Sequence, residues 1–117
     1  MNAQQGDLFR IRESDDGRRF VLDGELSFAS ASLALKDTAK LFASPSEKVF
    51  DLAGIIRADS AGVALLLEWR RRAREAGLKL HYVNLPSQLQ AIARVVGVDD
   101  ILSADANDGF RQSSKVN

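Results

Sequence analysis

The chain has 117 residues, with sixteen basic and sixteen acidic side chains, one histidine and no cysteine. Its length suits a single domain, and 45% hydrophobic with 27% charged residues is the composition of a folded soluble protein. A net charge of zero argues against non-specific nucleic-acid binding. The lack of cysteine excludes disulfides and thiolate ligands, and one imidazole is too few for a typical zinc site. We therefore expect no metal, no cofactor and no nucleic-acid partner.

The first residues and the apolar runs of the chain indicate where in the cell we expect the protein. The first residues lack the basic stretch and apolar run of a secretory signal. The longest unbroken apolar run, residues 63–67, is far shorter than the roughly 20 residues that a membrane-spanning helix needs. We expect a cytoplasmic protein that does not insert into a membrane and reaches one only through a partner.

The first half of the chain predicts a hairpin, a helix and a strand. Alternation over residues 8–13 indicates a half-buried strand, and Asp15-Asp16-Gly17 favours a turn into a second strand, 19–22, which Gly24 closes. Apolar residues at helical spacing predict a helix over 32–43, ended by Ser44-Pro45. The nearly continuous apolar run 48–53 is typical of a central strand covered on both faces.

The second half alternates helix and strand. We predict a helix over 61–76 that stops at Gly77, a strand over 78–83, a helix from Pro86 to Gly97 and a short element over 98–102. This order implies an α/β fold, with helices packed on a mixed sheet through right-handed crossovers. We assign residues 8–103 to one domain and expect 1–7 and 104–117 to be flexible termini.

The segment from Ala58 to Gly62 resembles the strand-to-helix turn that holds the nucleophile of serine hydrolases, with Ser60 in the nucleophile's place. However, the only histidine, His81, lies in the middle of a predicted strand, where it is a poor candidate for the base. A serine without its base is not a catalyst. We therefore assign no catalytic residue.

Ser60 also stands at the start of the longest predicted helix. Either Asp59 or Ser60 can cap this helix. An N-cap side chain contributes about 1 kcal/mol to stability. A hydroxyl at a helix N-terminus lies beside free N–H groups that accommodate a phosphate. Phosphorylation would place about −1.5 to −2 charges beside Asp59. Ser60 is thus a candidate switch site.

The helix that follows carries an apolar arc of about 200° when each residue advances by 100°. One side packs on the sheet, which leaves three arrangements for the flanks. The Val63/Leu67 edge is open to a partner, the Leu65/Trp69 edge is open, or neighbouring helices cover both. Arg70 and Arg74 lie beside this arc. Arginine side chains suit carboxylates on a protein partner.

Two segments resemble the signature of STAS domains, the module shared by sulfate transporters and anti-sigma factor antagonists. They are Phe50-Asp51-Leu52-Ala53-Gly54 and the run from Arg57 to Leu67, which contains Asp-Ser-Ala-Gly. The similarity extends from about Phe9 to Leu102 and includes the opening hairpin. It implies a STAS-like α/β fold, a mixed sheet with an N-terminal hairpin and helices packed on it.

Within this family, the single-domain form and the run from Ala64 to Trp69 are most similar to a small cytoplasmic subunit of phospholipid-transporting ABC complexes. These complexes maintain the lipid asymmetry of the outer membrane. The resemblance implies a non-enzymatic subunit, peripheral to the inner membrane, that binds the transporter's ATPase and supports it. It places Ser60 in the ATPase contact, with Asp59, Gly62 and the exposed side of the following helix nearby.

An alternative is implied by the anti-sigma factor antagonists, whose partner is a regulatory serine kinase that phosphorylates the residue matching Ser60. Those proteins commonly carry a second Ser or Thr and a later glycine, where this chain has Ala61 and Ala64. These departures make the sigma regulator the second interpretation.

Overall fold

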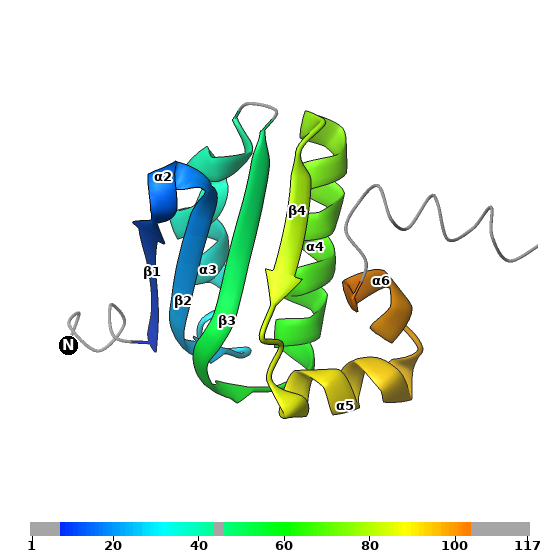
Figure 1. Ribbon diagram of the computed structural model, residues 1–117. Helices are drawn as coiled ribbons and strands as arrows, with labels where there is room; N and C mark the ends of the chain where they lie inside the picture. Colours follow the sequence, from blue (N-terminus) through cyan, green and yellow to red (C-terminus); the bar gives the residue numbers. More distant parts are fainter. Residues whose placement is uncertain (1–7, 44–45, 104–117) are drawn as a thin grey trace, which may run out of the picture.

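The structure is a computed structural model that describes residues 8–43 and 46–103 (Figure 1). The predicted helix end at Ser44-Pro45 and the predicted flexible termini lie outside the described residues. The elements run in the order β1 (Phe9–Ser14), α2 (Asp15–Arg18), β2 (Arg19–Leu26), α3 (Ala31–Thr38), η1 (Ala39–Phe42), β3 (Glu47–Ala58), α4 (Ser60–Ala76), β4 (Lys79–Val83), α5 (Ser87–Val96) and α6 (Asp99–Ser103).

The four strands form one mixed sheet in the order β1-β2-β3-β4. β1 and β2 pair antiparallel as the predicted hairpin, whereas β2, β3 and β4 run parallel. The hairpin turn is the short helical segment α2, in which Gly17 has a φ of 79°. A positive φ is the conformation for which glycine is favoured at a tight turn. The predicted α/β class and the mixed sheet with its hairpin are confirmed.

Two strands are longer than predicted. β2 does not close at Gly24 but continues to Leu26, because register shifts around Gly24 let the pairing with β3 resume. β3 runs five residues beyond the predicted end, from Ala53 to Ala58. The carboxyl ends of β2 and β3 therefore lie together, with Leu26 paired to Ala58 just before α4 begins.

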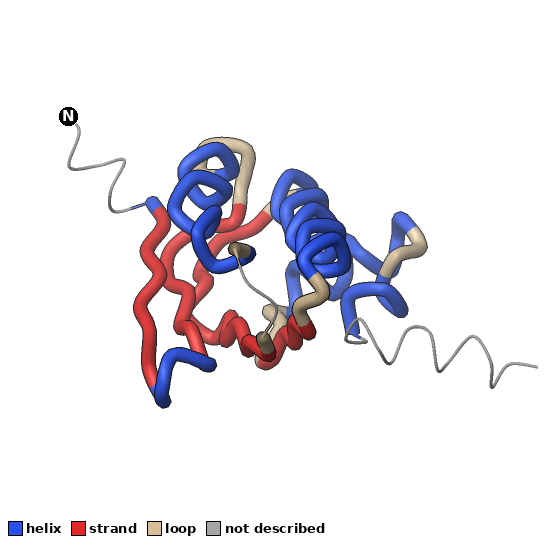
Figure 2. Tube along the Cα trace, turned by 90° about the horizontal axis from the view of Figure 1, so that it is seen from above, coloured by secondary structure: helices blue, strands red, loops and turns tan. Residues whose placement is uncertain are grey.

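β3 is not covered on both faces, which corrects the prediction for residues 48–53. Phe50 and Leu52 are fully buried, whereas Ala53 is exposed and Val49 and Asp51 are only partly buried. Because side chains alternate along a strand, these two sets lie on opposite faces of the sheet. Figure 2 shows α3 and α4 side by side over one face. The other face carries polar side chains such as Asp51.

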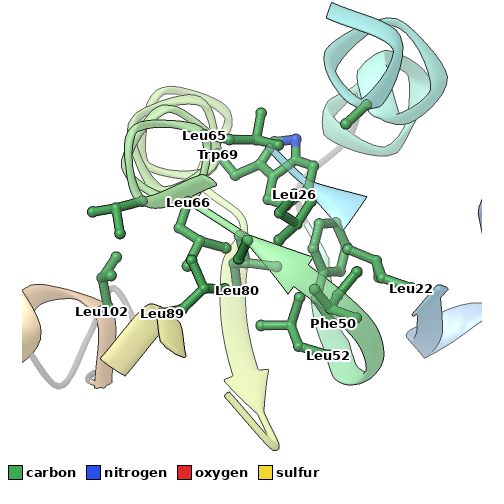
Figure 3. Packing of buried hydrophobic residues seen from close by; sticks show 14 of the residues in the cluster. Leu22, Leu26, Phe50, Leu52, Leu65, Leu66, Trp69, Leu80, Leu89 and Leu102 are labelled. Carbon is green, nitrogen blue, oxygen red and sulfur yellow. The ribbon is translucent and has the colours of Figure 1, made fainter. Parts of the chain in front are cut away.

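The core lies between the sheet and α4. Figure 3 shows Leu66 and Trp69 of α4 directed at side chains of the strands, with Leu65 beside Trp69. The Trp69 ring stands at 88° to the Phe50 ring with centroids 5.1 Å apart, an edge-to-face contact. Its indole N–H donates to the Thr38 hydroxyl at 2.8 Å, which joins α4 to the end of α3.

The helix ends agree with the glycine signals. Gly77 and Gly97 follow α4 and α5 with φ values of 72° and 82°. The first predicted helix is instead divided into α3 and the 3-10 turn η1, and Pro86 precedes α5 rather than lying in its first turn. Among the helices that the structure describes, none has the length and apolar character needed to cross a membrane.

Candidate functional site

The start of α4 is organised by the carboxylate of Asp59. Asp59, rather than Ser60, is the N-cap, and its Oδ1 accepts from the Ala61 N–H at 2.9 Å. Its Oδ2 accepts from the Phe28 N–H at 3.1 Å. The same side chain therefore satisfies a free N–H of the helix and holds the loop between β2 and α3 against the helix start.

That loop, residues 27–30, is fixed by a group of serine hydrogen bonds. The buried Ser30 hydroxyl donates to the Glu25 carbonyl at 2.7 Å and accepts from the Ser27 N–H at 3.0 Å. The Ser27 hydroxyl donates to the Glu25 carboxylate at 2.9 Å. Because both serines are anchored, the side chain of Phe28 between them is held at the surface.

Ser60 is the first residue of α4 and is exposed. Gly62, two residues later, is buried, and a Cβ there would overlap the carbonyl of Leu26. Glycine is thus needed where α4 passes closest to the end of β2. The two residues have different roles, since Ser60 is available to a partner and Gly62 brings the helix onto the sheet.

Two large apolar side chains are exposed at this end of the molecule. Phe28 has an exposed fraction of 87% and Ile56, near the end of β3, one of 84%. Phe28 lies one hydrogen bond from Asp59, and Ile56 lies two residues before Ala58, where β3 leads into α4. We define the Ser60 surface as Phe28, Ile56, Asp59 and Ser60. In Figure 1 the segments that carry these residues, the loop after β2, the end of β3 and the start of α4, lie at the same end of the sheet.

The flanks of α4 are covered, which is the third of the arrangements that the sequence left open, and the two open-edge alternatives are wrong. On the first edge Val63 is buried and Leu67 packs partly against the core. On the second edge Leu65 and Trp69 are buried. Neighbouring helices are the reason, because α3 and η1 contact α4 on one side and α5 and α6 on the other.

The two arginines predicted to border the partner surface differ in their surroundings. Arg74 is exposed near the end of α4, far along the helix from Ser60. Arg70 is buried, donates to the carbonyls of Leu80 and Leu102 at 2.7 and 3.2 Å, and lies 4.8 Å from the centre of the Tyr82 ring. Arg70 therefore joins α4 to β4 and α6 rather than facing a partner.

His81 does not serve Ser60 as a base. It pairs with Val49 near the beginning of β3, whereas Ser60 follows the end of that strand. Its Nε2 lies 2.8 Å from the Glu47 carboxylate. The described residues also contain no group of three histidine or acidic side chains that could hold a metal ion.

Sequence reasoning selected Asp59 and Ser60 but missed Phe28 and Ile56. Phe28 is a large aromatic residue within a segment of serine and alanine, Ser27 to Ser32, and this was a usable signal. Ile56 lies beyond the predicted end of its strand, so no pattern indicated which way its side chain points. The structure thus exposes large apolar side chains on a loop, a strand end, α5 and α6, and none on α4.

The family model described as "Mlab, STAS domain" matches residues 9–103. A search of the curated proteins finds no match. Among solved structures, the anti-sigma factor antagonist SpoIIAA in its unphosphorylated form has a TM-score of 0.56 at 14% identity, covering 74% of this chain and 81% of that chain.

Two larger proteins share the same fold over a small part of their length. SLC26A9 has a TM-score of 0.57 at 17% identity over 70% of this chain and 16% of its own. Mglu has a TM-score of 0.50 at 24% identity over 65% of this chain and 19% of its own. Identities this low establish similarity of fold alone.

Proposed function

This chain belongs to the STAS domain family, and from that premise we propose that it is a non-enzymatic accessory subunit of an ABC complex. It binds the MlaF-like ATPase subunit of a phospholipid transporter that maintains outer-membrane lipid asymmetry. In this role it is cytoplasmic and reaches the inner membrane through the transporter. The family model supports this choice because its description is that of the MlaB-type STAS domain.

The observation that carries the proposal is an exposed serine beside two exposed apolar side chains at the start of α4. Phe28 and Ile56 are among the most exposed large apolar side chains of the described residues. Burying one such side chain contributes about 1.5–3 kcal/mol. Aromatic anchors surrounded by polar groups carry much of the binding energy at protein interfaces. The Ser60 surface fits a protein partner with an apolar pocket better than it fits a small substrate.

The surface is also prepared for docking before the partner arrives. The Phe28 backbone is held by Asp59, and its flanking serines are bonded to Glu25. A surface that is already ordered loses less conformational entropy on binding. The ATPase would therefore meet an ordered surface that carries apolar side chains and the Ser60 hydroxyl.

The test is the double variant Phe28→Ser/Ile56→Ser, co-expressed with the tagged ATPase subunit. Because both side chains are exposed, we expect an unchanged melting temperature and at least a tenfold loss of affinity, from about 1.5 kcal/mol or more of lost apolar contact. The matched control is Val95→Ser/Ile101→Ser, which removes exposed apolar side chains from α5 and α6. Equal recovery of both double variants with the ATPase would contradict the proposal.

The exposed hydroxyl of Ser60 also supports the second interpretation, an anti-sigma factor antagonist controlled by phosphorylation. A kinase can reach Ser60 at the first position of α4 without unfolding the helix. Incubation with the cognate serine kinase and ATP would then add one phosphate to the wild type and none to Ser60→Ala. No gain in mass by the wild-type protein would contradict this interpretation.

A further inference from the structure

The outer edge of β1 has no strand paired to it among the described residues. Within this part of the chain, β1 is the first strand of the sheet and pairs with β2 on one side only (Figure 1). In an antiparallel pair, about half of the backbone N–H and C=O groups of an edge strand point away from its neighbour. We propose that this edge binds an extended acidic segment of a partner protein by strand addition. This second interface goes beyond the proposed contact with the ATPase.

A hollow of about 530 Å³ accompanies this edge. Its walls come from both faces of β1, since Arg10 and Arg12 line it together with Phe9 and Ile11. Asp23 of β2 and Asp37 of α3 complete the walls. Residues of both faces of β1 line this hollow, so it lies beside the strand. An added strand would pair along the same edge.

The two faces of β1 determine which side chains such a strand carries. Arg10 and Arg12 are exposed on the polar face of the sheet. Arg12 lies 3.8 Å from Asp23, a long ion pair between solvent-accessible groups that contributes little. On the other face Ile11 packs partly against the core. A partner strand with acidic residues toward the arginines and apolar residues toward Ile11 therefore matches both faces.

Charge also argues against a second copy of this chain as the occupant. When two copies of β1 pair antiparallel with their helical layers on the same side, residues of the polar faces come opposite each other. Arg10 and Arg12 of one copy would then meet the same arginines of the other. Like charges directly opposite in a sheet are destabilising, and charged edge residues are a known protection against self-pairing. The arginines thus disfavour a copy and favour acidic side chains on the polar face of an added strand, while Glu13 is exposed on the face of Ile11.

The test uses the capped peptide Glu-Val-Glu-Ile-Glu-Val-Glu and the whole 117-residue chain. Titration followed by backbone amide NMR should shift residues 9–14 and weaken as salt is added. The peptide with lysine at each glutamate should bind at least about tenfold more weakly, because each opposed charge pair contributes up to about 1 kcal/mol. Absence of binding at millimolar peptide, or shifts confined to other residues, would overturn the proposal.

Charge reversal supplies the specific variant. Arg10→Glu/Arg12→Glu should prefer the lysine peptide, and its fold should persist because both side chains are exposed. The control Arg74→Glu/Arg94→Glu changes the net charge equally at exposed helix positions and should keep the preference for the glutamate peptide. If both double variants respond alike, net charge rather than the β1 edge governs binding, and the proposal fails.

Strand pairing itself is tested through the peptide backbone. N-methylation at alternate peptide residues removes the amide donors of one edge. One methylated set should abolish binding and the other should leave it unchanged, since only one edge faces β1. Equal binding by both methylated peptides would rule out strand addition. Ser60→Glu should bind the acidic peptide as the wild type does, so failure of the Ser60 surface and failure of this edge are separable.

Discussion

Asp59 joins the two halves of the Ser60 surface. One carboxylate oxygen caps α4 through Ala61, and the other holds the backbone of Phe28. These two bonds explain why the family-like Asp-Ser pair stands at this turn: the aspartate arranges the surface and the serine is presented on it. A change at Asp59 should therefore affect both stability and docking, in proportions that depend on the replacement.

The first residue-scale prediction separates these two effects. Serine is a good N-cap. Its side chain is too short to accept hydrogen bonds from the Ala61 N–H and the Phe28 N–H at the same time. Asp59→Ala should lose about 1 kcal/mol or more of unfolding free energy, whereas Asp59→Ser should lose less. Both variants should bind the ATPase more weakly. Denaturant titration and affinity measurement check this, and full affinity in Asp59→Ser would show that the Phe28 bond is not needed.

The second residue-scale prediction concerns Asp51 on the polar face of the sheet. Burial alone would raise the pKa of this carboxyl, but hydrogen bonds from Asn84, the Ala53 N–H and Arg19 outweigh it and lower the pKa below 3.8. A lowered pKa in the folded state stabilises the protein above pH 3.8. That stability is lost as the pH falls through the folded-state pKa.

We therefore expect Asp51→Asn to be less stable than the wild type by about 1 kcal/mol at pH 7. The difference should shrink as the pH falls from about 4 through the lowered folded-state pKa of Asp51, because the wild-type carboxyl then becomes protonated in the folded protein as well. Thermal unfolding followed by circular dichroism at pH 7 and pH 3 measures it. A difference that stays constant between these pH values would show that the Asp51 charge contributes nothing.

At the scale of single residues, the sequence predicted which polar residues begin α4 better than it predicted which apolar side chains are exposed. An aspartate or serine before a helix follows from local hydrogen bonding, so the Asp59-Ser60 turn could be recognised. The exposure of Phe28 depends on Asp59, 31 positions away, and on the buried Ser30. No local pattern contains that information.

Among the elements, α4 is the support on which the site is built. Trp69 is fully buried, contacts the Phe50 ring edge-to-face and donates to Thr38. Arg70 on the adjacent position bonds the carbonyls of Leu80 and Leu102. Side chains that the wide apolar arc had suggested for a partner instead contact four neighbouring elements, α3, β3, β4 and α6.

The element-scale prediction follows from this burial. Trp69→Ala should cost about 3–5 kcal/mol through the cavity it leaves, whereas Arg74→Ala, at an exposed position of the same helix, should change stability by about 0.5 kcal/mol or less. Any loss of ATPase binding by Trp69→Ala should disappear at a temperature at which the variant is fully folded. A folded Trp69→Ala variant that cannot bind would restore the helix edge as a docking surface.

The limits of element prediction have a common physical cause. Periodicity and turn signals identified the four strands and the longer helices, but not the short helices α2 and η1, since an element that buries one side must repeat at its own period. It could not decide between an arc open to a partner and an arc covered by neighbours, because both need the same apolar residues. β3 shows the same limit: the apolar run from Val49 to Ala53 includes a half-open face that the pattern did not reveal.

Over the whole molecule, different surfaces lie on different parts of the fold. The carboxyl ends of β2 and β3, with the start of α4, carry the Ser60 surface, while β1 provides an edge on the side of the sheet. The general rule for open α/β sheets places binding at the carboxyl ends of the parallel strands. The order of elements therefore predicted the architecture and the end of the sheet where Ser60 lies, but not the side chains that surround it.

The central claim is that an ATPase docks on the Ser60 surface, and Ser60→Glu tests it most directly. A carboxylate in the first turn favours a helix, and α4 has no acidic residue there, so the variant should fold normally. Ser46→Glu, at an exposed serine before the opposite end of β3, is the control. We predict that Ser46→Glu co-purifies with the tagged ATPase at the wild-type yield while Ser60→Glu is lost. Recovery of Ser60→Glu at the wild-type yield would contradict the account.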